Sequence, residues 1–203
     1  MLYRKTVSEE LLELLNKIMI DEIFNNFVLV GGTALALQIG HRNSIDIDLF
    51  GNCEIDEDKF ISKIEILGSF EILKRSKNII ISSINKVKTD FVNYKYPLID
   101  EIVIIDGIRF ASKKDIAAMK INAILGRGSK KDFIDLYFLL KEFTFKEMIS
   151  FYEQKYNDGS VFMAVKSLSY FSDADKEFTP IMYDNNFNWE HCKQKILEEV
   201  CKL

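Results

Sequence analysis

The feature that most constrains the fold of this chain is the run GGTALALQIGHRNSIDIDLF, which extends from Gly31 to Phe50. The apolar segment FVLV directly before it predicts a short buried strand that ends at the double glycine. TALALQI then predicts a short helix, and Gly40 follows where a glycine commonly ends a helix. A strand, a tight turn and a helix in this order favour a mixed core of strands and helices.

The end of the run, SIDIDLF, predicts a second strand with a polar and an apolar face. Alternation places Ile45, Ile47 and Leu49 on one face and Asp46 and Asp48 on the other. Two carboxylates that point the same way repel each other unless a cation lies between them. Hard cations such as Mg²⁺ take oxygen ligands and commonly meet phosphate substrates through a few carboxylates plus water. The alternative is the solvated face of an edge strand, where charges are normal.

A third carboxylate on a neighbouring strand would complete such a site. Two-metal phosphoryl-transfer sites hold their ions about 3.5–4 Å apart and share ligands, which is more than one strand provides. Asp90 is the candidate, because it interrupts the strand-like run VKTDFV with a charge. A solvent-facing strand aspartate is the competing interpretation.

The double glycine predicts the phosphate side of the same site. Gly31 and Gly32 have no Cβ, so phosphate oxygens could approach their backbone closely. The N–H groups at the start of the helix, at Thr33, would then point at those oxygens. A plain strand-to-helix turn remains the alternative.

The rest of the pattern divides the chain in two. Ser8 is a predicted N-cap for an amphipathic helix, a second helix is predicted over 56–67, and FEILKR, NIIISSI and KVKTDFVNY read as strands. Asp106-Gly107 between two apolar runs predicts a type I′ hairpin. The pattern is helical from Ser112 onward. We therefore expect an α+β protein, with a mixed β-sheet core and helices in residues 1–111 and a helical region in 112–203.

Composition limits the classes of function. The chain has 27 basic and 31 acidic side chains, and a net charge of −4 argues against a protein that mainly coats nucleic acid. The three scattered cysteines fit a reducing compartment and argue against a zinc cluster. No segment has the length of a membrane span or the apolar core of a signal peptide. We expect a cytoplasmic protein that does not enter membranes.

The Gly31–Phe50 run resembles the first motif of the DNA polymerase β-like nucleotidyltransferase superfamily, in which a G-G or G-S turn precedes a D-x-D strand. More specifically, GGTAL followed by HRxSxDxD is similar to the AbiEii family of abortive-infection and type IV toxin–antitoxin toxins. The later run SKKDIAAMKINAILGRGSKKDFIDLYFLL resembles the second block of that family, a lysine-bearing helix, an R-G turn and a D-F-x-D-L-Y helix. The stretch from about Gly159 onward matches no motif.

The resemblance implies roles for the first motif. Asp46 and Asp48 would be catalytic metal ligands, with Asp90 as the third acidic position. The phosphate-binding turn would comprise the glycine pair with Thr33, and Ser44 would lie beside the nucleotide. Ser44 could instead be only a strand-entry residue. We interpret His41 and Arg42 as surface or phosphate-adjacent groups.

The resemblance also implies roles for the second block. Lys120 would contact the phosphates of the nucleotide, and Asp132 and Asp135 would belong to a later catalytic acidic motif. Lys113, Lys120 and Arg127 recur every seven residues, which places them along one stripe of a helix that could face nucleotide or acceptor. Such a stripe is otherwise a solvated helix face, and Asp132 could simply complement a helix N-terminus.

Together these observations predict an enzyme. The resemblance implies a nucleotidyltransferase that uses Mg²⁺ (or Mn²⁺) to move a nucleoside monophosphate from an NTP to an acceptor such as a tRNA 3′ end. It also implies a toxin with a cognate antitoxin as partner. The alternatives are an enzyme of the same fold that modifies a small molecule such as an antibiotic, and a non-catalytic nucleotide-binding or partner-binding module.

Overall fold

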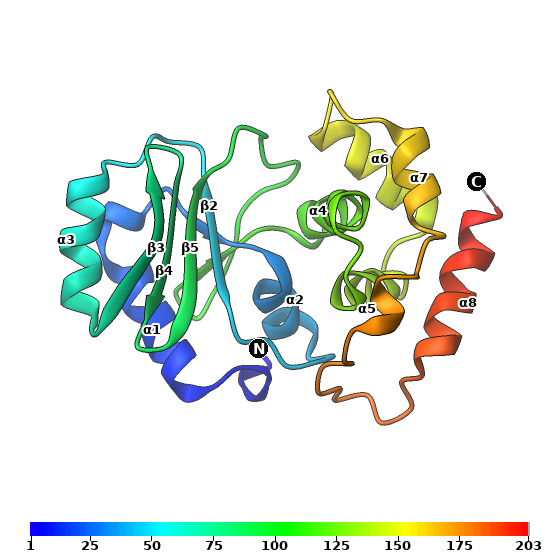
Figure 1. The fold of residues 1–203 in the computed structure, drawn as a ribbon, viewed down its shortest axis with the longest axis horizontal. Coiled ribbons are helices and arrows are strands. Elements are labelled where there is room, and N and C mark those ends of the chain that lie inside the picture. Colours follow the sequence, from blue (N-terminus) through cyan, green and yellow to red (C-terminus); the bar gives the residue numbers. More distant parts are fainter. Residues whose placement is uncertain (203) are drawn as a thin grey trace. The chain divides into compact units, whose positions relative to one another are not determined.

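The computed structural model describes residues 1–202, and the chain divides into two compact units (Figure 1). The first comprises residues 1–97 and 101–111, and the second comprises 98–100 and the chain from Ser112 onward. The predicted α+β class is confirmed, because within residues 1–202 the first unit contains the strands together with three α-helices and the second unit is helical. The boundaries 1–111 and 112–203, as domains, stay a prediction.

A mixed sheet is the centre of the first unit. Within the described residues it has seven strands in the order β3-β4-β5-β2-β1-β7-β6. β2 lies parallel to β5 and β1 parallel to β7, whereas the other neighbours are antiparallel. The strands are β1 Val28–Leu29, β2 Ile47–Gly51, β3 Phe70–Ser76, β4 Ile79–Ile84, β5 Val87–Asn93, β6 Val103–Ile105 and β7 Ile108–Phe110. The helices of this unit are α1 Glu9–Ile20, α2 Gly31–Ile39 and α3 Glu57–Leu67, with short 3-10 turns at Arg4–Thr6 and Glu22–Phe24.

Local signals account for these elements. The Ser8 hydroxyl accepts a hydrogen bond from Leu11 N–H at 3.2 Å and begins α1 as predicted. Gly40 ends α2 in the left-handed region at φ 72°. The hairpin between β6 and β7 has φ 52° at Asp106 and 80° at Gly107, and the positive φ at both positions is what a type I′ turn requires.

One face of the sheet is buried against α1 and α3. Phe91 of β5 lies within an aromatic cluster, with ring centroids 4.8 Å from Phe24, 5.5 Å from Phe60 and 5.7 Å from Phe27. All four rings are buried, and each contributes about 1.5–3 kcal/mol of hydrophobic stabilisation. Because side chains alternate along a strand, this core fixes the opposite face of β2 and β5 as the one that carries their polar residues.

One sequence expectation about this strand was wrong. Ile45 does not share the buried face of Ile47 and Leu49: β2 begins only at Ile47, and Ile45 is 69% exposed. Asp46 therefore lies one residue before the strand, and Asp48 lies within it.

The second unit is helical. Its helices are α4 Lys113–Gly126, α5 Lys130–Leu139, α6 Phe145–Lys155, α7 Val161–Ser167 and α8 Trp189–Val200, with a 3-10 turn at Ala174–Lys176. α4 packs against α5, α6 and α7, and α8 packs against α5. A capping box between Thr144 and Glu147 begins α6.

A buried ion pair fixes the short segment 98–100 to this helical unit. Asp115 and Lys155 are both fully buried and lie 2.7 Å apart. The Asp115 carboxylate also accepts hydrogen bonds from the backbone N–H groups of Ile99 (2.9 Å) and Asp100 (3.3 Å) and from the Ser112 hydroxyl (2.7 Å). Each of these contacts comes from a hydrogen-bond donor, so the free-energy cost of burying the Asp115 carboxylate is compensated.

Candidate functional site

The glycine turn lies directly against the second aspartate of the D-x-D pair. α2 begins at Gly31, two residues earlier than the Thr33 start suggested by the sequence, and Gly31 has φ +69°. A Cβ at Gly31 would lie 2.6 Å from Oδ2 of Asp48, so any other residue would displace that carboxylate. Glycine is therefore required here both for the backbone conformation and for the close approach of Asp48.

The second glycine lies against an arginine and a serine. A Cβ at Gly32 would collide with the Arg42 guanidinium and lie 3.4 Å from the Ser44 hydroxyl. The Thr33 hydroxyl is 2.8 Å from the Ser44 hydroxyl and also bonds the carbonyl of Asp46, which ties the start of α2 to the segment that enters β2. Hydroxyl groups and a guanidinium therefore lie next to the backbone of the two glycines.

Arg42 is a candidate site residue that sequence reasoning undervalued, because it lies against the glycine turn. His41 and Arg42 are each only 3% exposed, so the surface alternative for them was wrong, and the phosphate-adjacent alternative stays a prediction. The Arg42 guanidinium donates to the Asn43 carbonyl at 2.7 Å and lies against Gly32. The only sequence signal was the position of Arg42 between the glycine turn and the D-x-D run.

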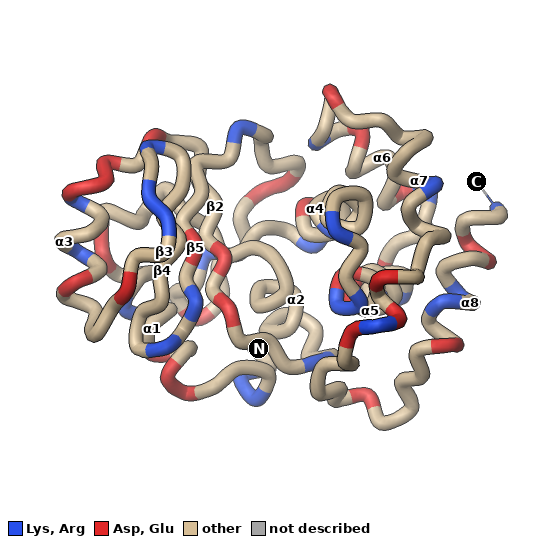
Figure 2. The backbone as a smooth tube through the Cα atoms, in the orientation of Figure 1, with Lys and Arg blue, Asp and Glu red and all other residues tan. Residues whose placement is uncertain are grey.

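The two strands that carry carboxylates are neighbours. Acidic residues, drawn in red, lie on both β2 and β5 (Figure 2). The two strands are parallel, and Asp48 is in register with Asp90, as the sequence interpretation required. Residues opposite each other in register present their side chains on the same sheet face. One oxygen of Asp90, Oδ1, is buried and has no hydrogen-bond partner in residues 1–202. A buried carboxylate oxygen without a donor is costly, and a cation would satisfy it.

Lys88 is a further member of this cluster that the sequence interpretation missed. Its ammonium lies 2.5 Å from Oδ2 of Asp90. Burial lowers the pKa of Lys88, but the hydrogen bond and charge of Asp90, together with the charges of Asp48 and Asp46, outweigh it and raise that pKa above its ordinary value. In the part of the chain that the structure describes, no three His, Cys, Asp or Glu side chains form a ready-made metal cluster. The acidic side chains therefore have to rearrange before three of them can share one ion.

Aromatic side chains extend the carboxylate face along the strands. Phe50 lies two residues after Asp48 and so shares its face. Its ring is 4.6 Å from the ring of Tyr94, which follows β5, and Tyr94 is 5.4 Å from Tyr96. All three rings are half-buried, unlike the fully buried aromatic core on the opposite face.

The residues predicted from the second block form their own cluster in the helical unit. The Lys120 ammonium of α4 lies 2.9 Å from Asp132 and 2.6 Å from Asp135 of α5, and all three side chains are at most 5% exposed. Arg127 donates two hydrogen bonds to Asp132, at 2.8 and 3.0 Å. Burial raises the pKa of Asp132, but the charges of Lys120 and Arg127 outweigh it and lower that pKa to about 2.

This cluster has a structural role irrespective of any catalytic one. It joins α4 to α5 through a buried lysine shared by two carboxylates. Lys113, the first member of the predicted stripe, instead pairs with Glu142. The catalytic and nucleotide-binding roles of Lys120, Arg127, Asp132 and Asp135 stay predictions.

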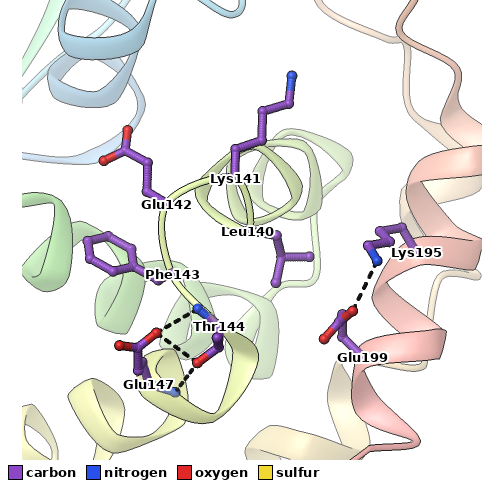
Figure 3. Close-up of a pocket in the computed structure, with 8 residues that line it drawn as sticks. All are labelled: Leu140, Lys141, Glu142, Phe143, Thr144, Glu147, Lys195 and Glu199. Carbon is purple, nitrogen blue, oxygen red and sulfur yellow. Dashed lines mark hydrogen bonds and ion pairs between the residues drawn. The ribbon is translucent and has the colours of Figure 1, made fainter.

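The helical unit also contains a pocket with a volume of about 340 Å³ (Figure 3). The capping box of α6 lies on one side of it, and Lys195 and Glu199 of α8, 3.0 Å apart, lie on the other. Among the charged groups that line it, Lys141 pairs with Asp184 and Glu142 pairs with Lys113, both of which lie outside the lining. Its lining residues are Leu140, Lys141, Glu142, Phe143, Thr144, Glu147, Lys195 and Glu199.

The mixed sheet with a glycine turn against a D-x-D strand defines a nucleotidyltransferase fold, and solved structures agree. JHP933 from Helicobacter pylori superposes with a TM-score of 0.61 at 18% identity, over 97% of this chain and 92% of that one. MenT4, the nucleotidyltransferase toxin Rv2826c from Mycobacterium tuberculosis H37Rv, superposes with a TM-score of 0.60 at 13% identity, over 96% and 83%. At such identities the likeness establishes the fold.

Sequence comparison identifies the family. Residues 13–102 match the family "Nucleotidyl transferase AbiEii toxin, Type IV TA system". The uncharacterized protein aq_aa25 of Aquifex aeolicus (strain VF5) is 38% identical over 202 residues, which cover 97% of each chain. The chain belongs to the AbiEii family of nucleotidyltransferase toxins of type IV toxin–antitoxin systems, as its motifs predicted. In residues 1–202, helices are too short or too polar to cross a membrane.

Proposed function

We propose that this toxin transfers a nucleoside monophosphate from an NTP to the 3′ end of a tRNA, with release of pyrophosphate. The observation that carries the proposal is the in-register pair Asp48 and Asp90, with Gly31 packed against Asp48. The AbiEii family supports the reaction class, and the resemblance to its toxins implies the tRNA acceptor. We further propose that the protein acts in the cytoplasm and that a cognate antitoxin counteracts it.

The carboxylates of the sheet have the chemistry that a divalent cation such as Mg²⁺ or Mn²⁺ requires, and they would draw together to share it. Asp46, Asp48 and Asp90 would hold it, because they supply the carboxylate oxygens that such ions take. The buried, unpartnered Oδ1 of Asp90 is the structural sign of this fit. When bound, the ion would neutralise charge on the phosphates and lower the pKa of the acceptor hydroxyl.

The glycine turn supplies the phosphate contacts. The first N–H groups of α2 have no partner within the helix and point out of its N-terminal end, which favours anions. Arg42 adds a guanidinium beside Gly32, a group suited to phosphate oxygens because it presents several donors in one plane. Thr33 and Ser44 hold the segment between α2 and β2 in place through their hydroxyl groups.

The half-buried rings of Phe50 and Tyr94 provide a surface for the nucleobase. They lie on the face of the sheet that carries Asp48, immediately beyond it along the strand. A base that stacks on an aromatic side chain gains about 1–3 kcal/mol whatever its identity. We therefore propose that a base lies over Phe50 while its phosphates lie toward Gly31.

The test is transfer of labelled nucleotide. The protein is incubated with each labelled NTP, Mg²⁺ and total RNA, and the label is followed to RNA, protein or small molecules. Asp48→Asn should abolish transfer, while Asp58→Asn, an exposed acid at the start of α3, should leave it intact. Retained transfer in Asp48→Asn would contradict the assignment of the site. Label on a small molecule instead of tRNA would contradict the acceptor.

A further inference from the structure

The acidic cluster of the sheet, formed by Asp46, Asp48 and Asp90, already has a lysine ammonium beside it. Lys88 and Asp90 are two residues apart on β5, so their side chains share the face on which Asp48 also lies. The Lys88 ammonium is 2.5 Å from Oδ2 of Asp90. The carboxylates of Asp48 and Asp46 lie near enough to act on the same ammonium.

An ammonium in this place opposes a divalent ion. A metal cation bound to either carboxylate oxygen of Asp90 would lie within a few ångströms of the Lys88 nitrogen. Two like charges this close repel each other strongly near a protein surface, and a divalent ion doubles the repulsion. Binding of a divalent ion to Asp90 is therefore unfavourable while the Lys88 ammonium also pairs with Asp90, so Lys88 has to move when the ion binds.

Lys88 has more freedom to move than Asp90, because its side chain is the more exposed of the two. The Lys88 side chain is 46% exposed and that of Asp90 only 15%. A lysine has a flexible four-carbon stem, and an ion pair whose ammonium side chain is nearly half exposed contributes little to stability. Little is lost when the ammonium turns into solvent.

We propose that Lys88 is a positioning residue that occupies the acidic cluster in place of the metal ion and must leave Asp90 when a divalent cation binds. This inference rests on the proposed function, since it takes Asp48 and Asp90 as metal ligands. Lys88 thereby lowers the affinity of the site for metal and keeps the carboxylates from repelling one another before metal arrives.

The test measures binding of Mn²⁺ alone and Mg²⁺ alone by calorimetry, without nucleotide. Lys88→Gln should tighten the metal Kd about two- to fivefold, which corresponds to the loss of a partly exposed ion pair. Lys88→Arg keeps the charge and should bind metal as the wild type does. The matched control is Lys59→Gln, because Lys59 pairs with Asp56 at 2.9 Å at the start of α3, which covers the opposite face of the sheet. The gain should also shrink as salt is raised.

The outcomes separate the two proposals. If Lys88→Gln binds metal no more tightly than the wild type while Asp48→Asn and Asp90→Asn bind it more weakly, the role of Lys88 is refuted and the metal site stands. If neither aspartate variant weakens binding, the metal assignment itself fails, and the role of Lys88 fails with it. A gain from Lys88→Gln that disappears in the Asp90→Asn background would support the inference, because it couples the two residues directly.

Discussion

Lys120 offers a sharp test of how the helical unit is held together. Lys120→Met removes the ammonium and keeps most of the stem, so Asp132 and Asp135 lose their shared buried cation. Removal of one partner from a buried ion pair costs about 3–5 kcal/mol. Arg127 and the Ser129 hydroxyl still donate to Asp132, so we expect the lower end of that range, about 3 kcal/mol.

The assay is thermal unfolding followed by circular dichroism at neutral pH. A loss of about 3 kcal/mol lowers the Tm of a chain of this size by about 6–12 °C. The control is Lys113→Met on the same helix, because Lys113 pairs with the part-exposed Glu142 and should cost at most about 1 kcal/mol. A Tm for Lys120→Met within about 2 °C of the wild type would refute the structural role. Loss of transfer in this variant is informative about phosphate binding only at temperatures where it remains folded.

Three further outcomes are expected. Gly31→Ala should lower the free energy of unfolding by about 1–2 kcal/mol for the left-handed backbone alone, which urea unfolding measures. It should also weaken Mn²⁺ binding, because the new Cβ displaces Asp48. A fully stable variant with normal binding would contradict the close approach of Asp48 to Gly31. Asp132→Asn should have a lower free energy of unfolding than the wild type at pH 7, and this difference should shrink as pH falls from about 3.8 toward 2. The reason is that Asp132, with its lowered pKa, stabilises the fold only while its carboxylate is charged. Unfolding free energies that differ equally at pH 7 and pH 2 would refute this. Phe50→Leu should raise KM for the NTP about fivefold or more with little change in kcat, and a KM within about twofold would exclude base stacking on Phe50.

Local signals in the sequence predicted most of the fold. The caps at Ser8 and Gly40 and the Asp106-Gly107 turn each depend on one or two residues whose backbone preferences are strong, so they hold in the folded chain. The sequence also predicted that the strands bearing Asp48 and Asp90 are neighbours, because a charged residue within an otherwise strand-like run indicates a polar contact at that position.

The remaining features depend on contacts between distant residues. Alternation alone could not show that β2 begins after Ile45, because the same pattern fits a strand that is longer at its start. Arg42 and Lys88 become site residues only once Gly32 and Asp90 are placed beside them. Likewise, the burial of Lys120 arises from α5 packing against α4, and spacing along one helix does not reveal it.

The attachment of Ile99 and Asp100 to Asp115 affects how the protein can be divided for experiments. A cut after Ala111 would separate the helices from two backbone donors, leaving the carboxylate that pairs with Lys155 short of partners. A fragment that starts at Ser112 should therefore be less stable than the same helices in the intact chain. Supplying residues 98–100 through a short linker ahead of Ser112 is the design that would restore it.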